Sequence, residues 1–368
     1  MHLAEIDLTN FKNIENASCR FSPKLNAIFG GNGMGKTNLL DAVHYLSIVR
    51  SHLSTIDRMA VKKGAEESFI AGTFINDKEE KERIVLKLRT RGSKQLNRNG
   101  KLYKRLSEHV GRFPSVVISP NDYKLIQGGS AERRRFLDRL LSQLDSQYLH
   151  VLSRYEQLLV QKSNLLRSDR PDAMLLDVLE EQMTEMGITI RAKRKTFTEE
   201  FIPFFQQLYQ SIGNTNEHTA LQYTTETQES YDDYLSAMRA LRNEELKSGI
   251  SLYGVHRDDI SMLLEDELIR KIGSEGQNKS YLTALKLAAY NLYAEKKGVY
   301  PFLLMDDLFD KLDEERVARI IALVMQPTYG QIFITDTNRK YLDEIIAQYG
   351  NSYTLFKVAY GQVEELSA

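Results

Sequence analysis

A glycine-rich segment near the start of the sequence has the residue types and spacing of a phosphate-binding loop. The pattern G-x-x-x-x-G-K-[ST] is matched by Gly30, Gly31, Asn32, Gly33, Met34, Gly35, Lys36 and Thr37. Glycines let successive backbone N–H groups point inward around a phosphate, and the N-terminus of the following helix adds partial positive charge. We therefore expect Lys36 to reach the β- and γ-phosphates of ATP and the Thr37 hydroxyl to be a ligand of Mg2+.

Two adjacent acids follow an apolar stretch in the last third of the sequence. Residues 302–305 are apolar and lead directly into Asp306 and Asp307. A buried strand would deliver Asp306 at its carboxyl end, where open α/β sheets bind their ligands. Alone, this pattern is equally typical of a solvated strand end. Together with the glycine-rich loop it predicts that Asp306 holds Mg2+ through water and that Asp307 is catalytic by orienting the attacking water. Lys36 would be the second catalytic residue, because it supplies positive charge to the transferring phosphate.

A second short segment has the features of a phosphate-binding device. Ser274, Gly276 and Gln277 lie at the start of an expected helix, where a hydroxyl, a glycine and exposed amides can meet a phosphate. The same residues often form only a helix cap. Because the glycine-rich loop already covers the near side of one γ-phosphate, this segment would have to come from another subunit. It therefore predicts a homodimer that forms with ATP.

These residues need a particular set of elements to position them. Short apolar or alternating runs predict strands at residues 2–8, 25–29, 68–75, 83–91, 115–119, 260–264, 302–305 and 332–335, with a hairpin turn at Asn99-Gly100. Helices are expected at residues 38–46, 279–294 and 314–325, and helical spacing recurs from a Ser130 N-cap through residue 209. We predict an α/β head made of residues 1–122 and 251–368, with residues 123–250 inserted as a helical lobe.

Composition narrows the class of protein. The 368 residues are 42% hydrophobic and 27% charged, which is ordinary for a globular protein and argues against disorder. A single cysteine, Cys19, excludes a disulfide framework and a CxxC metal site. Glu5 and Asp7 do not suit a signal peptide, and no apolar run approaches the length of a membrane span. We expect a cytoplasmic protein with no membrane partner.

One stretch is strongly basic although the whole chain carries a net charge of −1. Residues 81–112 contain eleven Lys and Arg against two acids, a local net charge of 11 − 2 = +9. Strand alternation would place Lys87, Arg89 and Arg91 on one open face, where they are expected to bind the DNA backbone. The alternative is a solvated sheet edge. A second cluster is expected on a solvated helix face: Arg191, Lys193, Arg194 and Lys195.

The order of these motifs resembles the ATP-binding-cassette (ABC) heads of SMC-like proteins and, more narrowly, the RecF family. The narrower resemblance rests on LTNFKNI at Leu8–Ile14, on SPNDYKLIQGGSAERRRFLD at Ser119–Asp138 and on GVHRDD at Gly254–Asp259. The turn Leu312-Asp313 completes the order, and the resemblance implies that Asp313 contributes to the nucleotide site. It also implies an ABC-type P-loop ATPase head with an inserted helical lobe, active in DNA replication, recombinational repair and the SOS response.

The resemblance further implies how such a protein works. It would be a slow, DNA-stimulated ATPase that acts as a molecular switch, binds single-stranded, gapped or duplex DNA, and pairs with a second copy on ATP. With RecO and RecR it would help to load RecA at single-stranded gaps.

Some residues depart from the family pattern, and two other functions remain open. Asn278 and Lys279 stand where the family usually has glutamine or arginine, and no histidine follows the strand at 332–335, so γ-phosphate sensing would have to come from Thr335 or Thr337. Gln127 is an unassigned candidate for the glutamine loop. The alternatives are the nucleotide-binding subunit of an ABC transporter, which would not explain the basic stretch, and a nucleotide-binding scaffold with negligible hydrolysis.

Overall fold

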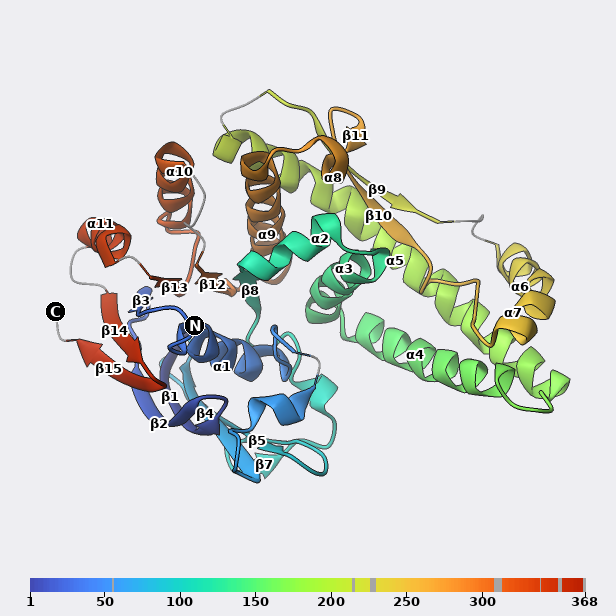
Figure 1. The fold of residues 1–368 in the computed structure, drawn as a ribbon, viewed down its shortest axis with the longest axis horizontal. Coiled ribbons are helices and arrows are strands. Elements are labelled where there is room, and N and C mark those ends of the chain that lie inside the picture. Colours follow the sequence, from blue (N-terminus) through green and yellow to red (C-terminus); the bar gives the residue numbers. More distant parts are fainter. Residues whose placement is uncertain are drawn as a thin grey trace. The chain divides into compact units, whose positions relative to one another are not determined.

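The computed structural model in Figure 1 describes the whole chain except residues 55, 214–215, 226–229, 308–312, 338, 350–352 and 367–368. The chain divides into two compact units. The first unit contains Met1–Asp122, Leu208–Thr215 and Ser274–Ala368, and the second contains Tyr123–Gln207 and Asn216–Gly273.

The first unit contains a six-stranded antiparallel sheet. In spatial order its strands are β2 (Ile14–Arg20), β1 (His2–Phe11), β4 (Glu67–Ile75), β5 (Lys81–Arg89), β6 (Gln95–Arg98) and β7 (Lys101–Leu102). Alternation along β5 buries Ile84, Leu86 and Leu88 and leaves the odd-numbered residues on the other face. The predicted hairpin joins β6 to β7, and Asn99 and Gly100 both have the positive φ that a two-residue turn of this kind requires.

A second, mixed sheet carries the predicted chemistry. Its order is β15 (Gln362–Leu366), β14 (Tyr353–Ala359), β3 (Leu25–Phe29), β13 (Ile332–Asp336), β12 (Phe302–Asp306) and β8 (Ser115–Ile118). All neighbours are parallel except β15, which is antiparallel to β14. Because β3, β12 and β13 run in the same direction, the residues that follow them gather at one edge of the sheet.

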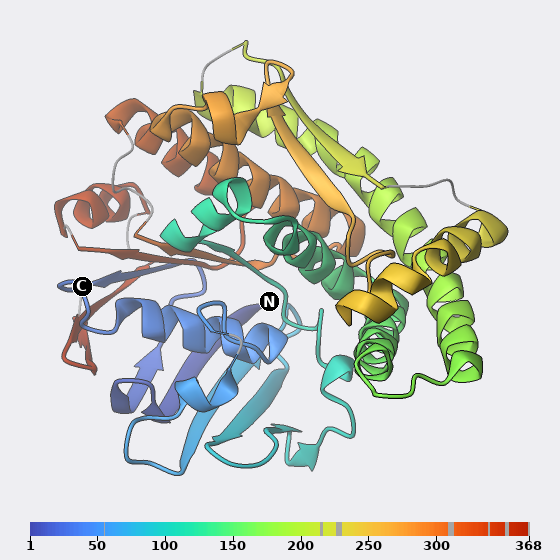
Figure 2. The ribbon, with the colours of Figure 1, turned by 45° about the vertical axis from the view of Figure 1, so that its right-hand side comes forward.

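Helix α1 (Lys36–Ile48) lies between the two sheets, as Figure 2 shows. Its apolar residues Leu39, Val43 and Leu46 belong to a single core that also contains residues of both sheets. The helix begins directly after the glycine-rich loop, so this core fixes the loop with respect to the strands around it.

Three further helices complete the first unit: α9 (Glu275–Lys297), α10 (Glu314–Val324) and α11 (Arg339–Tyr349). Single 3-10 turns lie at Asp57–Ala60, Leu106–Glu108 and Pro120–Asp122. Helix α10 connects β12 to the adjacent parallel strand β13, which confirms the predicted βαβ unit.

The second unit is mostly helical. Its helices are α2 (Tyr123–Gln127), α3 (Ser130–Leu144), α4 (Ser146–Leu166), α5 (Ala173–Gly213), α6 (Tyr231–Ala240), α7 (Arg242–Ser248) and α8 (Ile269–Ile272). A small antiparallel sheet of β11 (Glu267–Leu268), β10 (Asp259–Leu264) and β9 (Thr219–Thr224) accompanies them. Ser130 is the first residue of α3 and Gly129 is its N-cap, so the expected Ser130 cap was wrong by one residue.

The two units differ from the predicted head and lobe in two places. Residues 251–273 lie in the second unit rather than the head, because β10 pairs along its length with β9. Residues 208–213, the last residues of α5, lie in the first unit, where Tyr209 packs edge-on against Tyr281. Long-range strand pairing and aromatic packing of this kind leave no local pattern in the sequence.

Candidate nucleotide-binding site

The glycine-rich loop, here called the P-loop (residues 30–37), connects β3 to α1 as predicted. Lys36 is almost fully buried, and its Nζ donates to the carbonyl oxygens of Gly30 at 3.0 Å and Gly31 at 3.3 Å. A Cβ atom on Gly30 would lie 2.2 Å from the carbonyl oxygen of Val358, so only glycine fits beside β14. Gly35, the N-cap of α1, has φ 119°, which L side chains rarely adopt.

Two turns from opposite ends of the sequence hold the P-loop at Met34. The carbonyl oxygen of Met34 accepts a bond of 3.0 Å from Asn13 Nδ2 and one of 2.9 Å from the backbone N–H of Gly361. Asn13 also accepts from Asn38 Nδ2 at 2.7 Å, which ties it to α1. Sequence reasoning assigned no role to Asn13 or Gly361, although Asn13 lies in the LTNFKNI segment.

Asp306 lies beside the P-loop at the carboxyl end of β12 and is 4% exposed. One of its oxygens, Oδ1, accepts a hydrogen bond of 2.9 Å from the Thr37 hydroxyl and one of 2.8 Å from the Thr335 hydroxyl. The register of β12 and β13 sets Asp306 opposite Thr335. The structure therefore brings together the two predicted magnesium ligands, and it adds Thr335 as a residue that orients one of them.

Asp307 lies immediately beyond the end of β12 and reaches toward the same P-loop. Its backbone N–H donates to the Thr335 hydroxyl at 3.0 Å, and its φ of 40° is in the left-handed region. Its Oδ1 lies 3.8 Å from Lys36 Nζ, and its side chain is 30% exposed. A partly exposed carboxylate beside a buried ammonium has the surroundings required of a group that must meet both water and a phosphate. Thr335, fully buried between the two acids, could sense a phosphate only through them.

The donor set fits a magnesium ion bound together with a nucleotide. Hydroxyl and carboxylate oxygens are the ligands that Mg2+ prefers, and it usually takes one or two carboxylates and completes its shell with phosphate oxygens and water. Among the described residues, no group of three or more His, Cys, Asp or Glu side chains could hold a metal by itself. The site thus has the composition of a Mg-nucleotide site rather than of a protein-only metal site.

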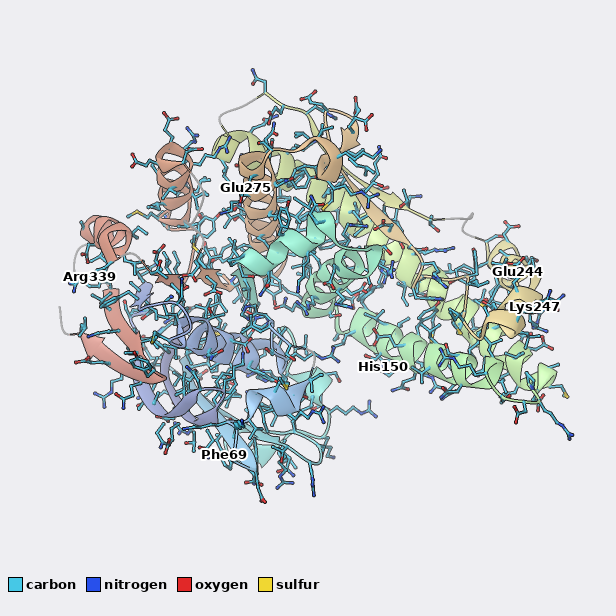
Figure 3. All side chains as sticks on the ribbon, in the orientation of Figure 1. Phe69, His150, Glu244, Lys247, Glu275 and Arg339 are labelled. Carbon is cyan, nitrogen blue, oxygen red and sulfur yellow. The ribbon has the colours of Figure 1, made fainter. Side chains whose placement is uncertain are left out.

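The segment Ser274–Gln277, here called the signature segment, begins α9. Ser274 Oγ accepts from the backbone N–H of Gln277 at 3.2 Å, and Gln277 Oε1 accepts from the backbone N–H of Ser274 at 2.8 Å. This capping box fixes the start of the helix. Glu275, labelled in Figure 3, stands on its first turn.

Asp313, implied by the resemblance, is the N-cap of α10. Its Oδ1 accepts from the backbone N–H of Arg316 at 2.9 Å, and its side chain is 54% exposed. Leu312, the other residue of that turn, lies outside the described residues.

The surface around the basic stretch is less positively charged than a count over the sequence suggests, because nearby acids pair with its cations. Lys87 and Arg89 lie on the open face of β5, as predicted, but both pair with Glu67 of β4, at 2.7 Å and 3.0 Å. The hydrogen bond from Lys87, together with Arg89, lowers the pKa of Glu67. Lys87 also lies over the ring of Phe69, which Figure 3 labels. Arg91 is exposed beyond the end of β5.

Ion pairs extend through the rest of this stretch. Six of its eleven cations pair with acids, namely Arg83, Lys87, Arg89, Lys94, Arg98 and Arg112. Three of the acids, Asp7, Asp57 and Glu67, lie outside residues 81–112. The local net charge of the sequence therefore overstates the charge of the surface.

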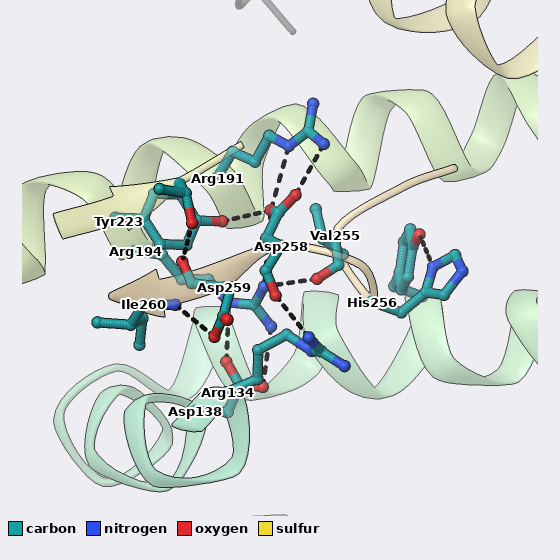
Figure 4. Close-up of polar contacts among 12 residues, drawn as sticks. Arg134, Asp138, Arg191, Arg194, Tyr223, Val255, His256, Asp258, Asp259 and Ile260 are labelled. Atoms are coloured by element: carbon teal, nitrogen blue, oxygen red, sulfur yellow. Dashed lines mark hydrogen bonds and ion pairs between the residues drawn. The ribbon is translucent and has the colours of Figure 1, made fainter. Parts of the chain in front are cut away.

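The second unit contains a buried network of charges, shown in Figure 4, in which residues of two family segments, Ser119–Asp138 and Gly254–Asp259, meet. Arg194 is 2% exposed and pairs with Asp138 at 2.9 Å, and it donates to the carbonyl oxygen of Val255 at 2.8 Å. Arg191 is 5% exposed and pairs with Asp258 at 2.8 Å. The prediction of a solvated face for these two arginines was wrong, because both are buried and form ion pairs inside the second unit.

The same network contains further residues of the two segments. Arg133 pairs with Asp259 at 2.8 Å, and Arg134 donates to the carbonyl oxygen of Asp258. His256 contacts the Tyr155 hydroxyl at 3.0 Å, and burial lowers the pKa of its imidazole to about 4. These charged residues of the two segments therefore contribute to the interior of the second unit. Gln127, the unassigned candidate for the glutamine loop, is exposed at the end of α2.

Comparison with known proteins decides the family. The model of the RecF/RecN/SMC N terminal domain matches residues 2–357. The DNA replication and repair protein RecF of Porphyromonas gingivalis W83 is 48% identical over 99% of this chain and 100% of its own length. The chain belongs to the RecF family. The RecF protein of Bacteroides thetaiotaomicron is 43% identical over the full length of both chains.

Solved structures agree with this membership. A structure of the recombination mediator protein RecF-ATP in the RecFOR pathway has a TM-score of 0.88 and 26% identity, over 100% of this chain and 98% of the other. An Smc head bound to the C-winged helix domain of ScpA has a TM-score of 0.57 and 14% identity, over 100% and 98%, and shows the shared fold alone.

RecF membership confirms the predicted α/β ABC-type ATPase fold and the family's role in DNA replication and repair. It sets aside the transporter alternative. No helix of the described residues has the length and apolar character needed to cross a membrane.

Proposed function

We propose that this chain is an ATP-dependent, DNA-binding switch in DNA replication, recombinational repair and the SOS response. The observation that carries the proposal is the contact of Thr37 and Thr335 with one oxygen of Asp306. A buried carboxylate held by two hydroxyls beside a P-loop has a fixed orientation, and second hydrogen bonds of this kind orient metal ligands in proteins.

In this proposal each residue of the site has a distinct task. The P-loop amides and Lys36 bind the β- and γ-phosphates, and Thr37 and Asp306 hold Mg2+, which would neutralise charge on the phosphates. Asp307 orients the water that attacks the γ-phosphate. The 3.8 Å separation of Lys36 Nζ and Asp307 Oδ1 supports this division, because it sets a cation and a water-accessible carboxylate on the same side of the loop.

The proposed switch is a head-to-head homodimer. Each nucleotide would lie between the P-loop of one copy and the signature segment of the other, with Ser274, Gly276, Gln277 and Asp313 on the second copy's side. The γ-phosphate would hold the two copies together, and slow, DNA-stimulated hydrolysis would release them.

We further propose that single-stranded, gapped or duplex DNA binds the open face of β5 through Lys87, Arg89 and Arg91. The names of the relatives support a role in replication and repair, and the RecFOR pathway named for one solved RecF supports RecO and RecR as partners and RecA loading as the outcome. Such a role supports the cytoplasm as the location.

Sizing the protein with and without ATP tests the switch. The wild type should be monomeric alone and dimeric with Mg-ATP by analytical ultracentrifugation, whereas Lys36→Ala should remain folded and monomeric. Ser274→Arg, which puts bulk at the proposed docking point of the phosphate, should bind ATP in calorimetry without pairing. A Ser274→Arg protein that dimerises as the wild type does would remove the basis for the composite site.

The same experiment separates a switch from a nucleotide-binding scaffold. In single-turnover conditions, a switch should convert bound ATP to ADP and return to monomer, at a rate that rises with DNA. A scaffold would keep ATP intact and stay paired.

A further inference from the structure

Arg316 is a cation that neither the motifs nor the family resemblance singles out. It lies in the first turn of α10, three residues after the cap Asp313. Asp313 holds it at two points, since the carboxylate accepts from the Arg316 backbone N–H at 2.9 Å and lies 3.3 Å from Nε of the guanidinium. The side chain is 24% exposed, so the guanidinium is oriented by its neighbours and still reaches the surface.

The guanidinium lies directly against the glycine of the signature segment. A Cβ atom on Gly276 would lie 2.2 Å from Nη1 of Arg316 and 3.4 Å from its Cζ. Any residue other than glycine at position 276 would therefore displace the guanidinium. Glycine at this position therefore leaves room for a cation of the same chain.

Ser274, two residues earlier, is oriented to act with this cation. Its Oγ accepts the Gln277 N–H, which uses a lone pair and leaves the hydroxyl hydrogen able to donate to another group. The Ser274 hydroxyl and the Arg316 guanidinium thus both lie near Gly276, in the segment that the proposed function assigns to phosphate binding.

Electrostatics explains why a cation is required at this point. The segments that meet here carry Glu275 on α9 and Asp313 and Glu314 on α10. A triphosphate that approached these acids alone would be repelled. A guanidinium can neutralise that charge and form two parallel N–H···O bonds to a phosphate.

We propose that Arg316 is a further ATP-binding residue, which donates from its guanidinium to the terminal phosphate held by the P-loop of a second copy. The inference rests on the proposed function, because it requires the head-to-head pair. Arg316 acts on the partner's nucleotide and not on its own, and Gly276 is the residue that makes room for it.

The expected effect is on pairing rather than on nucleotide binding by one copy. A hydrogen bond to a charged group contributes enough that its loss should weaken each site about tenfold. Two equivalent sites close each dimer, so Arg316→Ala should raise the dimer dissociation constant in Mg-ATP about a hundredfold. Arg316→Lys, which keeps the charge but not the fork, should fall between this variant and the wild type.

A matched control lies one turn further along the same helix. Arg319 donates to the carbonyl oxygen of Ile212 at 2.9 Å and lies 3.4 Å from Glu315, so both of these partners of its guanidinium lie outside the signature segment. Arg319→Ala removes the same charge from α10 and should leave the ATP-dependent dimer unchanged. Calorimetry on Arg316→Ala should give wild-type ATP affinity for the monomer. Equal dimerisation of the Arg316→Ala and wild-type proteins would overturn the inference.

Mixing variants tests action across the interface. Arg316→Ala retains its P-loop and Lys36→Ala retains its Arg316, so a mixed dimer has one complete site if Arg316 serves the partner. At a protein concentration at which neither variant alone pairs and hydrolyses ATP, hydrolysis should therefore appear on mixing the two. Absence of hydrolysis in this mixture would overturn the inference if Ser274→Arg mixed with Lys36→Ala does hydrolyse ATP. If that benchmark mixture and the wild type both fail to pair, the proposed function itself fails.

Discussion

Replacing Thr335 by valine tests the orientation of the magnesium ligand most directly. Valine has nearly the shape of threonine, so the change removes one hydroxyl from the buried site and little packing. That hydroxyl donates to Asp306 Oδ1 at 2.8 Å and accepts from the Asp307 N–H at 3.0 Å. Loss of such a partner typically weakens metal affinity about 10- to 100-fold, which corresponds to about 1.4 to 2.8 kcal/mol. We expect the Mg2+ concentration for half-maximal single-turnover hydrolysis to rise by that factor.

The control and the stability effect follow from the same two contacts. Thr335→Ser keeps the hydroxyl and should keep the wild-type Mg2+ midpoint. The valine variant should also unfold more easily, because the Asp307 N–H loses its acceptor inside the protein, at a cost of about 1 to 3 kcal/mol. Thermal unfolding checks this, and ATP affinity without Mg2+ should not change. A Mg2+ midpoint within twofold of the wild type in Thr335→Val would refute the reasoning.

Three further predictions concern the catalytic acid, the basic face and acid stability. Asp307→Asn should keep ATP binding and pairing but stall hydrolysis, since it removes the group that orients water; rapid-quench assays would contradict this if the rate were unchanged. Replacing Lys87, Arg89 and Arg91 together by alanine should flatten the salt dependence of DNA binding by roughly two to three units of slope, with unchanged ATP affinity. If the triple variant kept the wild-type salt dependence of DNA binding, these residues would be a solvated sheet edge and not a DNA-binding surface. Burial lowers the pKa of His109 to about 4, below the ordinary value of 6.5. Because the unfolded chain takes up the proton first, the free energy of unfolding should be highest above pH 6.5 and should fall as the pH drops from 6.5 to 4. His109→Gln should reduce this slope in urea titrations, and an unaltered slope would exclude the imidazole as its source.

The site was predictable where its residues are contiguous. The P-loop and the pair Asp306-Asp307 each occupy a few consecutive positions after an apolar strand, so local pattern and physical chemistry suffice to identify them. Thr335 was proposed only as a possible sensor, since its contact with Asp306 depends on which parallel strand lies beside β12. Asn13 was missed because its partner is a backbone carbonyl in the P-loop.

Charge was the least predictable property. A count over residues 81–112 ignores Glu67, which lies on another strand and pairs with Lys87 and Arg89. The spacing of Arg191 and Arg194 on a helix is the same whether their side chains meet water or buried acids, and here they meet Asp258 and Asp138. Strand periodicity nevertheless predicted the open face of β5 correctly, because alternation is a property of the strand itself.

The two turns that hydrogen-bond to Met34 have a consequence for folding during translation. The backbone N–H of Gly361 donates to the P-loop, and β14 pairs with β3. The loop and the strand before it are therefore stabilised by residues that are synthesised some three hundred positions later. During translation, at about 5 to 20 residues per second, the P-loop would leave the ribosome many seconds before these supports. We therefore expect that a nascent chain completes its nucleotide site only after the hairpin of β14 and β15 has folded.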